Sequence, residues 1–304
     1  MTHNIAASVH QRLLNQARSQ ERPFDELLHY FALERFLYRL GRSPYAAKFV
    51  LKGALMFNVW QGVSARSTRD VDLLGRMDNQ VASVVQAMQS VCREEPPEDD
   101  GLSFNAEAVT GLAITEAAQY QGVRVHVPAT LGNARIRLQV DVGFGDILVP
   151  GPTWVHLPTI LGNFPSPVLQ GYSRESAIAE KFQAIVYLGM LNSRMKDFYD
   201  IWSLATQFAF EGPVLALALG ETFRRRQTPF QMMPAAFTPA FTVNPEKQAQ
   251  WQAFVRRLPK VTTPPTLEAV VRCIAVLLLP VVQALVEERA FEQYWSPGGP
   301  WQER

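Results

Sequence analysis

The sequence predicts an α+β protein, with a mixed β-sheet core flanked by helices and a bundle of helices towards the C-terminus. Two observations carry this prediction. Apolar residues alternate with polar ones between about 103 and 142, which is typical of strands, whereas helical spacing dominates before residue 40 and after about 174. We therefore expect a first domain over residues 1–165 and a mainly helical second domain over 166–304, since 304 residues can bury two modest cores.

Composition narrows the class of protein. Lys and Arg nearly balance Asp and Glu, giving a formal net charge of +1, so no overall field indicates nucleic acid or a membrane surface as partner. Only Cys92 and Cys273 are present, which argues against a disulfide framework or a cysteine zinc site. The N-terminal residues lack the pattern of a signal peptide. These features favour a cytoplasmic location.

Short elements follow one another in the first domain. Apolar spacing predicts helices over 5–20 and 24–40, and Asp25 and Glu26 suit the start of the second. Next we expect a buried strand at 49–51, a short helix at 54–60, a strand at 67–74 and a helix at about 79–92. The sequence from Pro96 to Gly101 indicates an exposed acidic loop.

Asp70-Val71-Asp72 is the most informative motif. Side chains alternate along a strand, so Asp70 and Asp72 share one face while Val71 points into the core. Two carboxylates on one face suit Mg²⁺ or Mn²⁺, and Mg²⁺ commonly binds one or two carboxylates together with phosphate oxygens. Because the glycine turn at Gly53 precedes this strand, the pair suggests handling of a nucleoside triphosphate; a solvated strand face is the alternative.

A β-hairpin is predicted around the turn at Gly132-Asn133. In its second strand Ile136, Leu138 and Val140 face the core, which places Asp141 on the polar face as a candidate third carboxylate. The glycines at 143 and 145 lack the spacing of a dinucleotide-binding motif and indicate a turn.

The second domain is predicted to be helical over about 174–190, 194–208, 212–226, 246–258 and 266–291. The proline-rich segment 228–245 is expected to wrap the surface. The apolar run 274–286 contains Pro280 and is shorter than the roughly 20 residues that span a bilayer, so we expect a buried helix and no membrane contact.

A second charged cluster lies in this helical half. Lys181 with Arg194 or Lys196 could supply the cations that a triphosphate needs. Asp200 shares a helix face with Lys196 and with Asp197, so these residues can pair. A surface ion-pair helix would explain the same residues. The basic run 224–226 indicates a solvated helix end more than a nucleic-acid contact.

Taken together, the order of motifs resembles the nucleotidyl transferase AbiEii/AbiGii toxin family over about residues 45–210. The resemblance rests on motifs at 51–54, 70–72, 137–146, 179–181 and 192–200. It includes Lys181 separated by twelve residues from Arg194, which is followed closely by Asp197 and Asp200. The chain departs from the common Gly-Ser or Gly-Gly of the first motif, because it has Gly53-Ala54 instead. Backbone N–H groups, with the hydroxyl of Ser67 or Thr68, would then contact phosphate.

The resemblance implies a nucleotidyltransferase-like core whose helical domain completes the active-site cleft. It implies a toxin of a toxin–antitoxin or phage-defence pair that transfers nucleotides from an NTP to an RNA 3′ end, such as the tRNA acceptor end, and so blocks aminoacylation. The catalytic residues would be Asp70, Asp72, Lys181 and Asp197, and the metal ligands Asp70, Asp72 and Asp141. The residues that bind the NTP would be Lys52, Gly53, Ala54, Ser67, Lys181, Arg194 and Lys196.

Other functions fit the same residues. The core could transfer a nucleotide to a protein side chain or a small molecule, and clustered carboxylates also serve metal-dependent nucleases. A catalytically idle protein that binds a partner, such as an antitoxin, is the alternative from a different class. The five histidines show no metal-ligand spacing, and metal-assisted attack by an RNA 3′-hydroxyl needs no histidine base.

Overall fold

The computed structural model describes residues 4–62, 68–116, 120–258 and 264–303, which form two compact units. The first unit comprises residues 1–145 and 152–172, and the second comprises 146–151 and 173–304. Residues 166–172 thus belong with the first unit, because the strand they contain extends its sheet. The predicted division between residues 165 and 166 lies close to this boundary, and the role given to each half stays a prediction.

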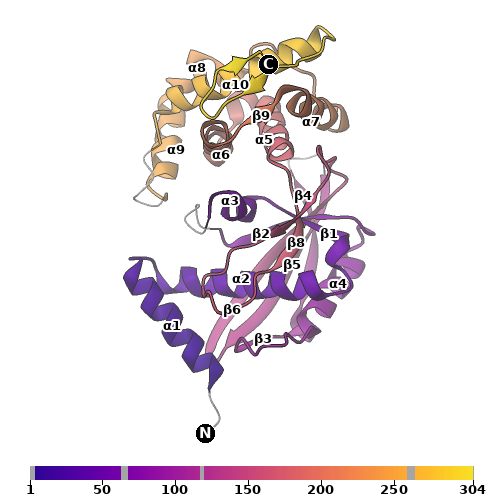
Figure 1. Cartoon of the computed structure of the whole chain (residues 1–304), viewed down its shortest axis with the longest axis vertical. Coiled ribbons are helices and arrows are strands. Elements are labelled where there is room, and N and C mark those ends of the chain that lie inside the picture. Colours follow the sequence, from indigo (N-terminus) through magenta and orange to yellow (C-terminus); the bar gives the residue numbers. More distant parts are fainter. Residues whose placement is uncertain (1–3, 63–67, 117–119, 259–263, 304) are drawn as a thin grey trace. The chain divides into compact units, whose positions relative to one another are not determined.

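The first unit is built on a mixed sheet of eight strands, which confirms the predicted fold class (Figure 1). The strand order is β3-β5-β6-β2-β1-β8-β7, and β4 pairs with β5. Strands β2 and β6 are parallel, as are β1 and β8, and the other pairs are antiparallel. The strands are β1 (Phe49–Lys52), β2 (Asp70–Gly75), β3 (Leu102–Phe104), β4 (Thr110–Glu116), β5 (Tyr120–Leu131), β6 (Ala134–Phe144), β7 (Thr153–His156) and β8 (Val168–Gly171).

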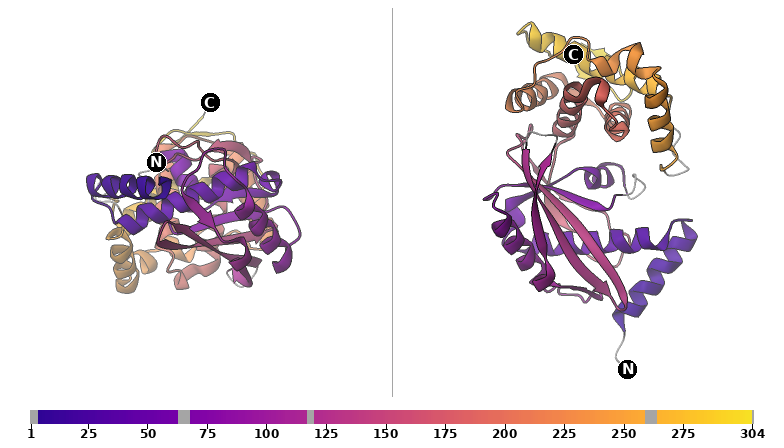
Figure 2. Two further views of the ribbon diagram at one scale, coloured as in Figure 1. Left: turned by 90° about the horizontal axis from the view of Figure 1, so that it is seen from below. Right: turned by 180° about the vertical axis from the view of Figure 1, so that it is seen from behind.

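The predicted hairpin is the longest part of this sheet, with β5 and β6 running side by side in the view from behind (Figure 2). Leu131 pairs with Ala134 across a two-residue turn. Val71, Leu138 and Val140 are fully buried, so one face of β2 and β6 belongs to the core and the other carries the polar residues. The alternation of the sequence thus determined which side chains share the polar face.

The α-helices described in this unit are α1 (Ile5–Ser19), α2 (Phe24–Arg42), α3 (Ala54–Gln61) and α4 (Val81–Arg93). Helices α2 and α4 pack against the sheet and against each other. Most of α2 is buried, including the charged residues Glu34, Arg35 and Arg39. A buried charge is costly unless it is paired, so each of these side chains must have partners.

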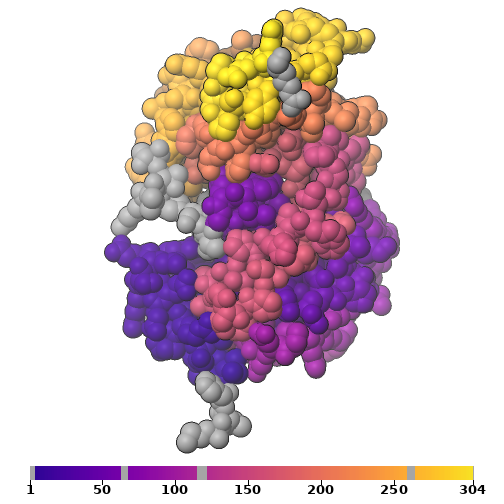
Figure 3. Space-filling model, in the orientation of Figure 1, coloured from indigo at the N-terminus to yellow at the C-terminus, as the bar shows by residue number. Residues whose placement is uncertain are grey.

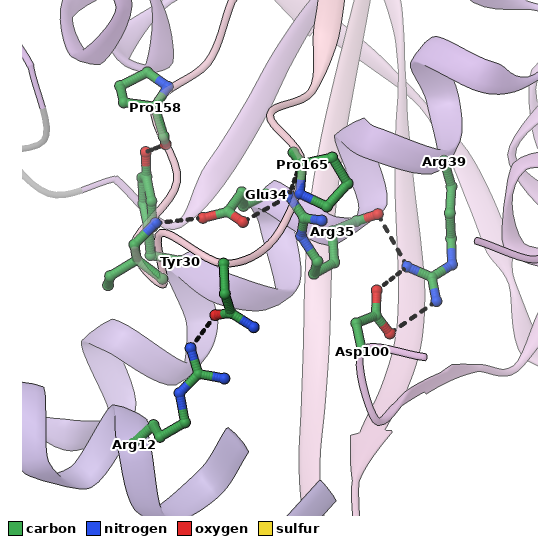
Figure 4. Close-up of polar contacts among 10 residues, drawn as sticks. Arg12, Tyr30, Glu34, Arg35, Arg39, Asp100, Pro158 and Pro165 are labelled. Atoms are coloured by element: carbon green, nitrogen blue, oxygen red, sulfur yellow. Dashed lines mark hydrogen bonds and ion pairs between the residues drawn. The ribbon is translucent and has the colours of Figure 1, made fainter. Parts of the chain in front are cut away.

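The segment between β7 and β8 supplies some of those partners, and it covers α2 at the surface seen in Figure 3. Glu34 Oε2 accepts a hydrogen bond of 2.7 Å from the backbone N–H of Ile160, and Arg35 donates one of 2.7 Å to the carbonyl of Pro165 (Figure 4). Glu34 and Arg35 also form an ion pair at 2.7 Å. These contacts fasten the segment 157–165 to the helix.

The prediction of an exposed acidic loop is wrong for Asp100. It is buried, and its carboxylate accepts two hydrogen bonds from Arg39, at 2.7 and 3.0 Å (Figure 4). The neighbouring residues Glu98 and Asp99 are exposed as predicted. The buried Arg39 guanidinium requires a carboxylate, and the loop brings Asp100 to it.

The second unit is mainly helical, as predicted. Its helices are α5 (Arg174–Leu188), α6 (Met195–Gln207), α7 (Gly212–Arg225), α8 (Pro239–Thr242), α9 (Pro245–Val255) and α10 (Leu267–Val286). A small antiparallel sheet of β9 (Phe210–Glu211), β10 (Tyr294–Trp295) and β11 (Trp301–Gln302) accompanies them. The sequence did not predict this sheet, since each strand has two residues. The proline-rich segment holds only short helical turns.

Helix α10 lies within the predicted range 266–291 and ends at Val286, before the predicted end. It begins at Leu267 and, among the residues placed in the structure, it alone is long and apolar enough to cross a membrane by length and composition. Its buried residues, such as Leu277 and Val281, pack against α6, α7 and α8, and the indole of Trp301 donates to the carbonyl of Leu277. This packing is that of a core helix.

Candidate active site

The glycine turn after β1 lies directly against Asp72. Gly53 has φ of 69°, a region that L side chains rarely adopt. A Cβ at this position would lie 1.9 Å from Oδ2 of Asp72, so only glycine permits this approach. Helix α3 starts at the next residue, Ala54. The turn thus places the positive end of a helix beside a carboxylate-bearing strand.

Asp70 and Asp72 lie on β2, as predicted, and both are partly exposed. Asp72 is in register with Lys52 on β1 and with Asp141 on β6, so three neighbouring strands contribute one charged row. Lys52 is largely buried, and its ammonium lies 5.6 Å from the centre of the Tyr172 ring. The row joins the carboxylates of the Asp-x-Asp motif to a cation held at the glycine turn.

Asp141 is held from the other side by Arg124 of β5. The guanidinium donates two hydrogen bonds of 2.8 Å, one to each carboxylate oxygen, and Gln139 donates a third at 3.2 Å. Hydrogen bonding to Asp141 raises the pKa of Arg124 further above its usual value. Since both oxygens of Asp141 have protein donors, its role as a metal ligand stays a prediction.

The second unit gathers its own charged cluster around Lys181 of α5. The ammonium lies 3.0 Å from Oδ1 of Asp197 and 2.8 Å from Oδ2 of Asp200, both on α6 and both buried. Arg194 Nε lies 2.8 Å from Oδ2 of Asp197 in an ion pair. Two buried carboxylates pair with the ammonium of Lys181 and fix its position.

The pairing of Lys196 with Asp200 that their spacing allows does not form. Asp200 pairs with Lys181 instead, and Lys196 is exposed. Residues four apart on a helix can interact. Asp200 is buried, however, so its carboxylate pairs with Lys181, the cation that lies inside the unit, and not with the exposed Lys196. Local spacing therefore identified the right carboxylate and the wrong partner.

The other predicted site residues lie at the start of α3, near the start of β2 and at the end of α7. Ala54 is buried at the start of α3. Ser67 lies outside the residues that the structure describes, and Thr68 accepts a hydrogen bond of 3.3 Å from the N–H of Asp70. In the basic run, Arg224 is exposed and pairs with Glu221, as the prediction of a solvated helix end expects. Arg226 departs from that prediction, because it is largely buried and pairs with Asp146 at 3.0 Å.

The donor set at β2 fits Mg²⁺ or Mn²⁺. Asp70 and Asp72 offer two carboxylates on one strand face, and Asp72 lies directly against the turn at Gly53. Hard divalent ions take such oxygen ligands and complete their shell with phosphate oxygens and water. No group of three His, Cys, Asp or Glu side chains suited to a metal occurs within the described part of the chain, so the protein would supply few ligands.

Sequence reasoning missed Arg124. The signal was present in the hairpin, because counting outward from the pair Leu131 and Ala134 places Arg124 opposite Asp141. It also missed Tyr172, whose ring lies beside the ammonium of Lys52 and which belongs to no recognised motif.

A glycine turn and an Asp-x-Asp strand thus lie side by side in a mixed sheet. The family model described as "Nucleotidyl transferase AbiEii toxin, Type IV TA system" matches residues 35–273. The chain belongs to this family of nucleotidyltransferase toxins, and the family implies an antitoxin partner. No curated protein matches the chain in sequence.

Two solved structures are similar to the chain. The crystal structure of a candidate nucleotidyltransferase from H. pylori is 15% identical with a TM-score of 0.48, and the match covers 88% of this chain and 99% of that one. The crystal structure of JHP933 from Helicobacter pylori is 14% identical with a TM-score of 0.49, and the match covers 87% of this chain and 94% of that one.

Proposed function

We propose that this toxin transfers nucleotides from an NTP to the 3′ end of an RNA, namely the acceptor end of tRNA, in the cytoplasm and with Mg²⁺ or Mn²⁺. Such a modification would block aminoacylation and translation. The observation that carries the proposal is the placement of Asp70 and Asp72 on one strand face, with Asp72 against the turn at Gly53. This arrangement suits a metal-bound triphosphate more than a solvated strand.

The residues of the first unit would hold the reacting phosphate. Asp70 and Asp72 would bind the divalent ion, which when bound neutralises phosphate charge and lowers the pKa of the attacking hydroxyl. The positive N-terminal end of α3 and the ammonium of Lys52 would attract the phosphates from the adjacent side. Arg124 holds Asp141 in place beside Asp72 through two hydrogen bonds.

The residues of the second unit would supply further positive charge. Lys181, Arg194 and Lys196 are the cations that we assign to the NTP and the departing pyrophosphate. Asp197 and Asp200 hold Lys181 in one position, so Asp197 acts in catalysis by positioning this lysine. A preorganised ammonium stabilises developing charge better than a mobile one.

A transfer assay tests this function. The purified protein is incubated with total bacterial tRNA, Mg²⁺ and each labelled NTP in turn, beside Asp72→Asn and the control Asp99→Asn, an exposed loop carboxylate. We expect label in RNA with the wild type and with Asp99→Asn, and at least a 10²-fold lower rate with Asp72→Asn. Circular dichroism confirms that each variant is folded.

Three results would overturn the proposal. Label on protein or on a small molecule would move the acceptor to another class. Shortened RNA would indicate a nuclease. If no NTP supports transfer when Mg²⁺ or Mn²⁺ is added in a buffer without chelator, the result would favour a protein that acts only by binding its partner.

A further inference from the structure

A second cleft adjoins Asp70 at the edge of the sheet. Strand β6 begins at Ala134, but its pairing with β2 begins only where Asp70 meets Gln139. The first residues of β6 therefore present an edge that no strand among the described residues occupies on that side. A cleft of about 510 Å³ lies here, between this edge and the N-terminal half of α2.

Arginines dominate the lining of this cleft. Arg69 lies just before β2, and Arg135 and Arg137 lie on the polar face of β6, all three exposed. The structure gives none of the three an ion-pair partner among the residues it describes. Two carboxylates, Asp25 and Asp70, also line the cleft. Arginines held close together without partners favour an anionic ligand.

Two histidines complete the lining. His29 Nε2 lies 2.8 Å from the carbonyl of Arg69 and must donate its proton, because a carbonyl only accepts. This bond fastens the backbone of Arg69 to α2. His126 is in register with Gln139, and its buried Nδ1 has no hydrogen-bond partner. A buried polar atom without a partner indicates a place where a ligand or water completes the site.

The spacing of the arginines distinguishes a polymer from a nucleotide. Arg137 lies four residues and Arg135 six residues from Asp141, which correspond to about 14 and 20 Å along the strand. A triphosphate held at Gly53 and Asp72 is too short to extend over that distance. The two arginines themselves are about 7 Å apart, a separation comparable to that of successive phosphates in a nucleic-acid chain.

We propose that this cleft binds the backbone phosphates of the acceptor RNA, with Arg135, Arg137 and Arg69 contacting the nucleotides that precede the 3′ end. The inference rests on the proposed function, since it takes the acceptor to be RNA. It adds a binding site on the first unit that leads the strand to Asp70. Phosphate contacts of this kind fix the register of a nucleic acid without reading its sequence.

Binding is measured without NTP, so the test is independent of catalysis. Fluorescein-labelled tRNA is titrated with the wild type, with Arg135→Gln/Arg137→Gln, and with the charge-matched control Arg42→Gln/Arg93→Gln, whose exposed arginines lie outside the cleft. We expect the cleft variant to bind about tenfold more weakly, and its plot of log affinity against log salt to be less steep by about 1.5. The control should bind within about twofold of the wild type.

Steady-state kinetics give the second readout. The cleft variant should show a raised KM for tRNA, with kcat and the KM for NTP unchanged. Equal tRNA affinity and salt dependence in the wild type and the cleft variant would overturn the inference. A raised KM for NTP alone would also overturn it, because the cleft would then serve the nucleotide. Failure of the proposed function would instead appear as tRNA binding without transfer.

Discussion

Arg124 on β5 and Asp141 on β6 face each other across the hairpin, joined by two hydrogen bonds of 2.8 Å. A two-pronged pair of this kind fixes both side chains and holds the carboxylate beside Asp72. The predicted third carboxylate of the site is thus part of a coupled pair.

This coupling can be measured with a double-mutant cycle. Arg124→Gln and Asp141→Asn should each lower the free energy of unfolding by about 1 kcal/mol, because Arg124 is partly exposed. The double variant should lose little more than either single variant, since both remove the same interaction. Urea denaturation gives the three values, and strictly additive losses would show that the pair is uncoupled.

Gly53→Ala should abolish transfer while costing only modest stability. The positive φ of 69° costs about 1 to 2 kcal/mol for alanine, and the added Cβ would push Asp72 out of place. Gly62→Ala is the matched control, because φ is 85° there and the Cβ would meet open space. Both variants should show similar urea midpoints, and only Gly53→Ala should lose nucleotide transfer. Equal activity in the two would contradict the steric role of Gly53.

Lys181→Met should be strongly destabilising. It leaves Asp197 and Asp200 buried without their shared cation, a change that typically costs about 3 to 5 kcal/mol. The triple variant Lys181→Met/Asp197→Asn/Asp200→Asn should recover at least half of this loss in a thermal unfolding experiment. It should remain inactive if Lys181 contacts the NTP. Recovery of transfer together with stability would assign the cluster a purely structural role.

The stability of the first unit should depend on the ionisation of Glu34. Burial raises the pKa of Glu34 to about 7, although Arg35 and the N–H of Ile160 act in the opposite direction. Because the folded pKa exceeds the unfolded value of 4.5, the stabilising contribution is complete below about pH 4.5 and is lost as the pH rises through 7.

The variant Glu34→Gln isolates this effect, since glutamine keeps an acceptor for Ile160 and does not titrate. The free energy of unfolding of the wild type, relative to Glu34→Gln, should fall by about 3 kcal/mol between pH 4.5 and pH 8. Urea denaturation at several pH values measures the difference. A difference that does not change with pH would mean that Arg35 keeps Glu34 ionised throughout.

Much of the site followed from periodicity and turns alone. Alternation along β2 and β6 placed Asp70, Asp72 and Asp141 on the polar face, and the two-residue turn at Gly132-Asn133 determined their register with β5. These features are local, because a strand alternates its side chains and a tight turn sets the pairing whatever the rest of the chain does. The same reasoning located the helices of the second unit.

The tertiary structure decided the partners. Asp200 pairs with Lys181 of another helix and not with Lys196 on its own, and Asp100 leaves solvent to meet Arg39. Strand β8 pairs with β1, far away in sequence, so four residues that show little strand pattern extend the sheet. Buried charges and short strands are stabilised by the partners that the fold brings to them, and local spacing does not record which residues those are.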